Sequence, residues 1–223
     1  MIDAAKAAAW WVRDYAYASA WQIRALFNRT DPESFLSGER TPVIVLPGIY
    51  ETWKFLQPLV AAIHERGHPV HVLDALRRNE SPVLEAAEQV TAYLTEQNLR
   101  DVIIVAHSKG GLIGKQVMIG PSADRVRSML AVSTPFGGSR YALLMLPPTL
   151  RIFSPMDATI VALARQETVN SRIVSVYGRF DPHIPEGSEL PGAKNVKLET
   201  GGHFRILAHP RVPAEFTLLA RAR

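Results

Sequence analysis

Short apolar runs alternate with helical patterns from Pro42 to the end of the chain. A run such as Val43–Leu46 has no polar position, which is typical of a strand buried on both faces of a parallel sheet. We expect strands at residues 43–46, 70–73, 102–106, 128–132, 173–177 and 195–198. Apolar residues three and four positions apart predict helices at 53–66, 81–98 (with Ser81 as N-cap), 110–119, 156–166 and 213–222. This alternation predicts an α/β fold: a mostly parallel central sheet of about six strands with helices on both faces.

The first part of the chain has a different pattern. It is rich in alanine and has no Gly or Pro before Pro32, which predicts a helix over 4–27. Its charged residues share one stripe with Trp10, Tyr17 and Trp21, so nearly all of the remaining circumference is apolar. We expect this helix to pack on the domain or on a second subunit, with contact to a membrane surface as the alternative.

Turn-forming residues between 28 and 42 indicate a linker after this helix. We therefore divide the chain into an N-terminal amphipathic helix with its linker, 1–41, and one α/β domain, 42–223. Residues 139–166 are a candidate small lid within that domain.

Composition narrows the function classes. The 223 residues, 47% of them hydrophobic, suffice for one sizeable core. The absence of Cys excludes disulfides and cysteine nucleophiles. It also fits a reducing compartment, so we expect a cytoplasmic protein, which is peripheral to a membrane if the first helix binds one. The net charge of +4 arises from 25 cations among 21 anions without a long run, so nucleic acid is not an expected partner. Charged residues interrupt the N-terminal apolar stretch, so neither a transmembrane segment nor a signal peptide is expected.

The strongest chemical signal is the run VIIVAHSKGG at 102–111. A buried strand enters a turn with the pattern small-His-Ser-x-Gly-Gly, and a helix follows. Such a corner holds the hydroxyl of Ser108 clear of the backbone, and Ala106, Gly110 and Gly111 supply the small neighbours that it requires. The alternative is an ordinary glycine turn between a strand and a helix.

A nucleophilic serine needs a base and an acid that orients the base. Asp181 lies just past the C-terminal end of a predicted strand, at the edge where open α/β sheets place their sites, and His203 lies in a glycine-rich loop after the last strand. His183 and His209 are alternative bases, and Asp74 is an alternative acid.

The oxyanion formed during acyl transfer needs hydrogen-bond donors. The backbone N–H groups of Ile49, after Pro47-Gly48, and of Lys109, at the start of the helix, are the candidates for an oxyanion hole. We expect the side chain of Lys109 to be solvated at the rim.

Residues 141–150 are strongly apolar for a connection. They form either a lid or acyl-chain wall over Ser108, or a buried strut under the next helix. The candidates for the substrate pocket or lid are Tyr50, His107, Phe136, Leu143, Leu144 and Leu146. No metal or cofactor is expected, because Gly67 and Pro69 end the helix within the one zinc-like motif, His64-Glu-Arg-Gly-His68.

Taken together, these motifs resemble the α/β-hydrolase superfamily, and within it the small bacterial lipases and esterases of the Bacillus lipase A type. The matching stretches are 42–49, 106–111, 177–181 and 190–195 leading to Gly202-His203. The resemblance implies an α/β-hydrolase fold with Ser108 as nucleophile, Asp181 as acid, His203 as base, and the N–H groups of Ile49 and Lys109 as oxyanion hole. Three features depart from it: Pro47-Gly48 stands where the family commonly has His-Gly, the interval after residue 137 is longer, and the N-terminal helix has no counterpart.

The leading prediction is a serine hydrolase that cleaves carboxylic esters, with apolar acyl or lipid esters favoured, through an acyl-enzyme. An amidase or acyltransferase using the same triad, and a non-catalytic binding protein on the same scaffold, are the alternatives. The expected partner is a small-molecule ester.

Overall fold

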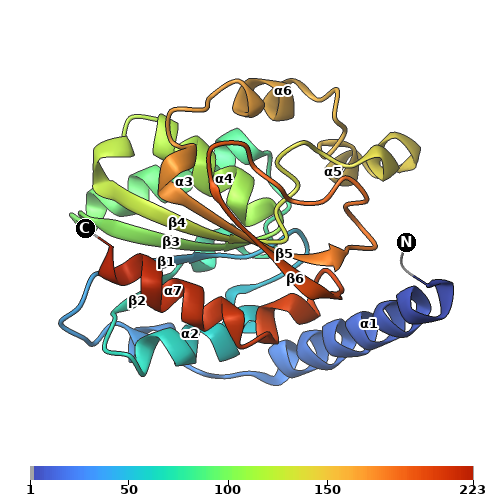
Figure 1. Cartoon of the computed structure of the whole chain (residues 1–223). Helices are drawn as coiled ribbons and strands as arrows, with labels where there is room; N and C mark the ends of the chain where they lie inside the picture. The colour runs from blue at the N-terminus through green and yellow to red at the C-terminus, as the bar shows by residue number, and fades with distance from the viewer. Residues whose placement is uncertain (1–2, 223) are drawn as a thin grey trace.

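Six parallel strands form one sheet in the computed structural model, which describes residues 3–222 (Figure 1). Their order across the sheet is β2-β1-β3-β4-β5-β6, and each neighbouring pair is parallel. The strands are β1 (Val43–Leu46), β2 (Val70–Val72), β3 (Val102–His107), β4 (Val126–Val132), β5 (Ile173–Phe180) and β6 (Lys194–Gly201). The predicted α/β class and six-stranded parallel sheet are confirmed.

Helices cover both faces of this sheet. In Figure 1, α3, α4 and α6 lie above it, and α2, α7 and α1 lie below it. The α-helices are α1 (Ala4–Phe27), α2 (Gln57–His64), α3 (Val83–Glu96), α4 (Lys109–Ile119), α5 (Pro148–Arg151), α6 (Ala158–Ala164) and α7 (Arg211–Arg221). Short 3₁₀ helices are η1 (Pro32–Phe35), η2 (Trp53–Leu56), η3 (Asp74–Leu76), η4 (Ala123–Arg125), η5 (Arg140–Leu144), η6 (Asn170–Arg172) and η7 (Arg205–Ala208).

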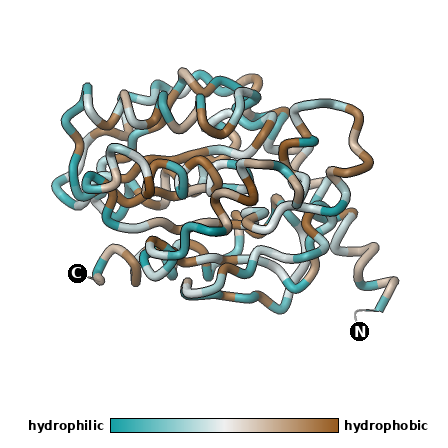
Figure 2. Tube along the Cα trace, turned by 90° about the horizontal axis from the view of Figure 1, so that it is seen from above, coloured by the Kyte–Doolittle hydropathy of each residue, from teal (hydrophilic) through white to brown (hydrophobic). Residues whose placement is uncertain are grey.

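The apolar runs form two cores because successive strand residues point to opposite faces. Ile44 and Leu46 belong to the cluster under α3 and α4, whereas Val43 and Val45 belong to the cluster that α2 and α7 cover. Figure 2 shows the hydrophobic stretches gathered in the middle of the molecule, where these strands lie. This two-sided burial explains why the strands read as continuous apolar runs.

Two helix starts differ from the sequence-based expectation. The predicted helix at 53–66 is split into η2 and α2, and Pro58 stands in the first turn of α2. Ser81 does not cap α3, which begins at Val83 with Pro82 as N-cap. Pro82 has an extended ψ of 151°, so the chain becomes helical only after it.

The predicted N-terminal helix is present with the expected bounds, and it packs on the domain. Trp10, Asp14 and Ala18 of α1 are buried, and Tyr17 and Trp21 pack against the lower core. The aromatic residues of the predicted stripe and Asp14 therefore face the protein, whereas Lys6, Arg13 and Arg24 of the same stripe are exposed. The opposite, uncharged face is left exposed, and its large members are Val12, Ile23, Leu26 and Phe27.

Within residues 3–222, no helix combines the length and the apolar character that crossing a membrane requires.

Candidate active site

Ser108 occupies a strained corner between β3 and α4. Its backbone has φ of 50° and ψ of −119°, a conformation that side-chain-bearing residues adopt rarely and at a cost. Two glycines make the corner possible. A Cβ on Gly110 would overlap the carbonyl group of Leu46, and one on Gly111 would overlap the side chain of Thr134. The corner therefore matches the strand–turn–helix arrangement that exposes a serine hydroxyl.

A chain of hydrogen bonds joins the three residues that the sequence analysis selected. The Oγ of Ser108 lies 2.9 Å from Nε2 of His203, and Nδ1 of His203 lies 2.8 Å from Oδ2 of Asp181. The other oxygen of Asp181 accepts from the backbone N–H groups of His183 (2.8 Å) and Ile184 (3.1 Å). This carboxylate is thus held in place, and it can hold the imidazole in one tautomer.

The fold brings these residues together because their strands are parallel. Ser108 follows β3, Asp181 follows β5 and His203 follows β6 by two residues. Parallel strands present their carboxyl ends at one edge of the sheet, where α/β proteins place their sites. β5 and β6 both run three residues beyond the predicted ends, to Phe180 and Gly201, which carries the chain to that edge.

Three carboxylates raise the pKa of His203, the candidate base. Burial lowers the pKa of His203, but the negative charges of Asp181, Glu51 and Asp14 and the hydrogen bond to Asp181 outweigh it, so the pKa lies above its ordinary value. The imidazolium that forms when His203 takes a proton is therefore stabilised in the site.

His107 and Glu51 form a buried hydrogen-bond network next to the site. His107 was a candidate for the substrate pocket, but its ring is fully buried and does not line the cavity. Its Nε2 donates to the carbonyl oxygen of His203 at 3.1 Å, and its Nδ1 lies 2.9 Å from Oε2 of Glu51. The same Glu51 oxygen accepts from the N–H of Gly48 at 2.7 Å. This network links the loop after β1 to the loop that carries His203, and nothing local in the sequence signals it.

The alternative acid and bases take other positions. His183 lies beside the base, with ring centroids 4.7 Å apart, and its Nε2 pairs with the Tyr15 hydroxyl at 2.9 Å rather than with Ser108. Burial and the charge of His203 lower the pKa of His183 to about 3, so it stays neutral beside the base. Asp74 instead accepts from the indole of Trp53 at 2.7 Å, and His209 accepts from the N–H of Arg211 at 3.2 Å.

A cavity of about 360 Å³ opens beside Ser108. Tyr50 lines it as predicted, and its hydroxyl pairs with Thr149 of α5 at 2.6 Å. The lining residues are Tyr15, Gln22, Ile49, Tyr50, Glu51, Ser108, Pro135, Ser139, Tyr141, Ala142, Met145, Leu150, Phe153, Pro182, His183, Ile184, His203 and Phe204.

Besides His107, four of the six predicted pocket or lid residues do not line this cavity. Phe136 lies in the upper core instead, because the chain after β4 turns it inward. Leu143, Leu144 and Leu146 are exposed, and Tyr141, Ala142 and Met145 of the same segment form the wall in their place. The apolar interval thus borders the cavity, and its movement as a lid stays a prediction.

The candidate oxyanion donors lie at the ends of β1 and β3. Ile49 lines the cavity, and the N–H of Lys109 begins α4 next to Ser108. Among residues 3–222, neither N–H has an acceptor. Both donors are thus free to bind an incoming oxygen.

The Lys109 side chain is not solvated, contrary to the expectation. It is fully buried, and its Nζ donates to the carbonyl oxygens of Asn79 (2.6 Å) and Ser81. Asn79 in turn donates through Nδ2 to the carbonyl of Pro47 at 2.6 Å. Burial lowers the pKa of Lys109 to about 8. The side chain therefore ties the start of α4 to the loop that carries Ile49, through acceptors far away in the sequence.

Comparison with known proteins identifies the fold. No family model matches the chain, and no curated protein matches it by sequence. Solved structures do match. A monoacylglycerol lipase from Paleococcus ferrophilus has a TM-score of 0.64 and 17% identity, covering 83% of this chain and 96% of its own.

Two further neighbours agree with this match. The lipase BlEst2 from Bacillus licheniformis has a TM-score of 0.59 and 16% identity over 86% of this chain and 94% of its own. An extracellular α/β-hydrolase from a Paenibacillus species has a TM-score of 0.57 and 15% identity, covering 82% of this chain and 100% of its own. The chain therefore has the α/β-hydrolase fold, as its motifs predict. The narrower resemblance to Bacillus lipase A stays a prediction.

Proposed function

We propose that this protein is a serine hydrolase that cleaves carboxylic esters through an acyl-enzyme. The observation that carries the proposal is the unbroken path from Ser108 Oγ to His203 Nε2 (2.9 Å) and from His203 Nδ1 to Asp181 Oδ2 (2.8 Å), at the wall of a cavity. A hydroxyl, an imidazole and a carboxylate in this order form the arrangement that activates serine for acyl transfer.

Each group has a definite part in the proposed reaction. His203 Nε2 takes the proton of Ser108 while Oγ attacks the ester carbonyl carbon, and the N–H groups of Ile49 and Lys109 bind the resulting oxyanion. His203 then gives the proton to the leaving alcohol as the acyl-enzyme forms. Water repeats the sequence in the second half-reaction, releasing the acid and restoring the Ser108 hydroxyl. Asp181 stabilises the imidazolium throughout.

The cavity walls support an ester with an apolar acyl group. Ile49, Met145, Leu150, Phe153 and Ile184 contribute aliphatic and aromatic surface beside Ser108. Sites for apolar ligands are lined in this way, with few polar groups that fix orientation. A volume of about 360 Å³ suits a small molecule.

A panel of nitrophenyl esters of increasing acyl length tests the proposal. We expect hydrolysis by the wild-type protein, a preference for apolar acyl groups, and loss of at least ~1,000-fold in kcat/KM in Ser108→Ala. The corresponding anilides and acceptor alcohols distinguish an amidase and an acyltransferase. Folded wild-type protein that turns over none of these substrates would identify the scaffold as a binding protein instead.

A further inference from the structure

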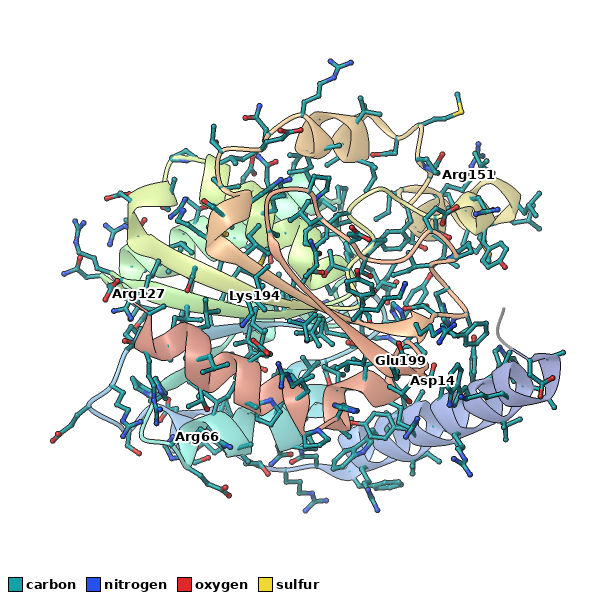
Figure 3. All side chains as sticks on the ribbon, viewed as in Figure 1. Asp14, Arg66, Arg127, Arg151, Lys194 and Glu199 are labelled. Carbon is teal, nitrogen blue, oxygen red and sulfur yellow. The ribbon has the colours of Figure 1, made fainter. Side chains whose placement is uncertain are left out.

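Asp14 of α1 is a buried carboxylate at the back of the site. Its side chain is fully buried, although the helix that carries it lies mostly at the surface. Figure 3 labels Asp14 on the side of α1 that faces β6. A buried charge is expensive unless hydrogen bonds or an opposite charge compensate it, so its partners indicate why it is there.

Those partners are three successive backbone N–H groups of the loop that carries the base. Oδ2 of Asp14 accepts from the N–H of His203 at 2.8 Å, and Oδ1 accepts from Phe204 at 2.9 Å and Arg205 at 2.7 Å. Charge-assisted hydrogen bonds of this kind are about twice as strong as neutral ones. The carboxylate therefore fixes the backbone of His203 itself, and the carbonyl of the same residue is held from the other side by His107.

The loop is shaped to receive this helix. Gly202 has φ of +125°, and a Cβ there would lie 2.5 Å from Oδ1 of Asp14. A Cβ on Gly201 would lie 2.5 Å from the ring of Trp10. The Gly-Gly pair before the base is thus explained by the close approach of α1, independently of the hydrogen bonds.

The helix also reaches the rest of the site. The Tyr15 hydroxyl pairs with His183, which lies against the ring of His203, and Gln22 donates to the carbonyl of Tyr50 at 3.2 Å. Tyr15 and Gln22 line the cavity. α1 is therefore a wall of the site and a support for its base.

We propose that Asp14 is a positioning residue, whose carboxylate holds the His203 loop so that the imidazole meets both Ser108 and Asp181. The proposal rests on the proposed function, since it assigns His203 the part of base. The negative charge of Asp14 also contributes to keeping the pKa of His203 above its ordinary value.

Asp14→Asn and Asp14→Ala test this inference against Asp3→Asn, which changes the exposed carboxylate that caps the same helix. Asn keeps the size of the side chain and one acceptor but removes the charge, and Ala removes every hydrogen bond. We expect kcat for nitrophenyl esters to fall ~10- to 100-fold in Asp14→Ala, less in Asp14→Asn, and KM to change little. Asp3→Asn should behave as wild type.

NMR titration of the His203 ring provides a readout that needs no substrate. The pKa of His203 should be lower in Asp14→Asn than in wild type, because a nearby negative charge has been removed. If wild-type protein hydrolyses no ester while this shift is observed, the proposed function fails and the positioning role stands. If Asp14→Asn folds and both kcat and the His203 titration equal those of wild type, the inference is overturned, even where Asp14→Ala does not fold.

Discussion

Ser108 presents its hydroxyl to His203 at the cost of an unfavourable backbone conformation. Residues other than glycine at such positive φ are found where the surrounding structure compensates the strain, and active sites are common among these places. Here the hydrogen bond from the Ser108 N–H to the carbonyl of Val132, at 2.9 Å, and the glycines of α4 hold the corner.

Removal of the strain should stabilise the protein. Ser108→Ala keeps a Cβ and therefore the strain, whereas Ser108→Gly relieves it, so we expect the Gly variant to be more stable than the Ala variant by about 1 kcal/mol. Urea unfolding of the two variants measures the difference. Both variants lack the Ser108 hydroxyl and should be inactive, so their stabilities are compared at equal loss of function. An Ala variant as stable as the Gly variant, or more stable, would contradict the presence of strain.

The pH dependence of the reaction follows from the base. The proposed ester cleavage requires neutral His203, and the pKa of this residue lies above the ordinary 6.5 because Asp181, Glu51 and Asp14 outweigh burial. As pH falls through that pKa the imidazole becomes protonated, so kcat/KM should decline on the acid side with a midpoint above 6.5. A rate profile measured with an ester that does not titrate checks this expectation. A midpoint below 6.5, in protein that remains folded there, would be the opposite result.

Sequence alone predicted those site residues whose role is indicated by the residues next to them in the chain. Ser108 stands in a distinctive corner, Asp181 directly follows β5, and His203 follows β6 by two residues. Asp14 and Glu51 could not be found in this way, because Asp14 binds backbone N–H groups of the distant His203 loop and Glu51 binds the ring of the distant His107. The burial of Lys109 was missed for the same reason, since its acceptors come from the loop before α3.

Among the elements, α1 shows most clearly what periodicity can and cannot predict. Its bounds followed from the absence of Gly and Pro, but the face that packs was not predictable from hydrophobicity. The packed face carries aromatic rings and the buried charge of Asp14, because Asp14 binds backbone N–H groups and Trp10 lies against Gly201. The uncharged face is left in contact with solvent.

We expect this exposed face of α1 to bind anionic lipid surfaces. Ile23 and Leu26 are 56% and 79% exposed, and Lys6, Arg13 and Arg24 lie along one edge of the helix where they can reach headgroups. Ile23→Glu/Leu26→Glu should weaken binding to vesicles of phosphatidylcholine and phosphatidylserine at least ~10-fold. Cosedimentation measures the binding.

The matched control is Leu84→Glu, a half-exposed leucine on α3 across the sheet, which should leave vesicle binding unchanged. Deletion of the helix is not a clean test, because it also removes Asp14 from the His203 loop. The expectation would be wrong if wild-type protein does not bind vesicles but forms dimers that Ile23→Glu/Leu26→Glu abolishes. This face would then bind a second copy of the chain.

For the whole molecule, the order of apolar runs and helical patterns along the chain predicted the α/β class. Because the strands pair in parallel, the carboxyl ends of β3, β5 and β6 then lie at one edge of the sheet. The cavity wall was less predictable. Whether Tyr141 or Leu144 faces the cavity depends on how η5 and α5 turn, and a short irregular segment has no periodicity that shows it.

The nucleophilic role of Ser108 is tested most directly by reaction of the folded protein with a fluorophosphonate, followed by mass spectrometry of the labelled peptide. We expect one phosphonyl group per chain, attached to Ser108, with labelling abolished in Ser108→Ala and strongly slowed in His203→Ala. Protein that stays unlabelled while folded, or that is labelled at another residue, would contradict this role.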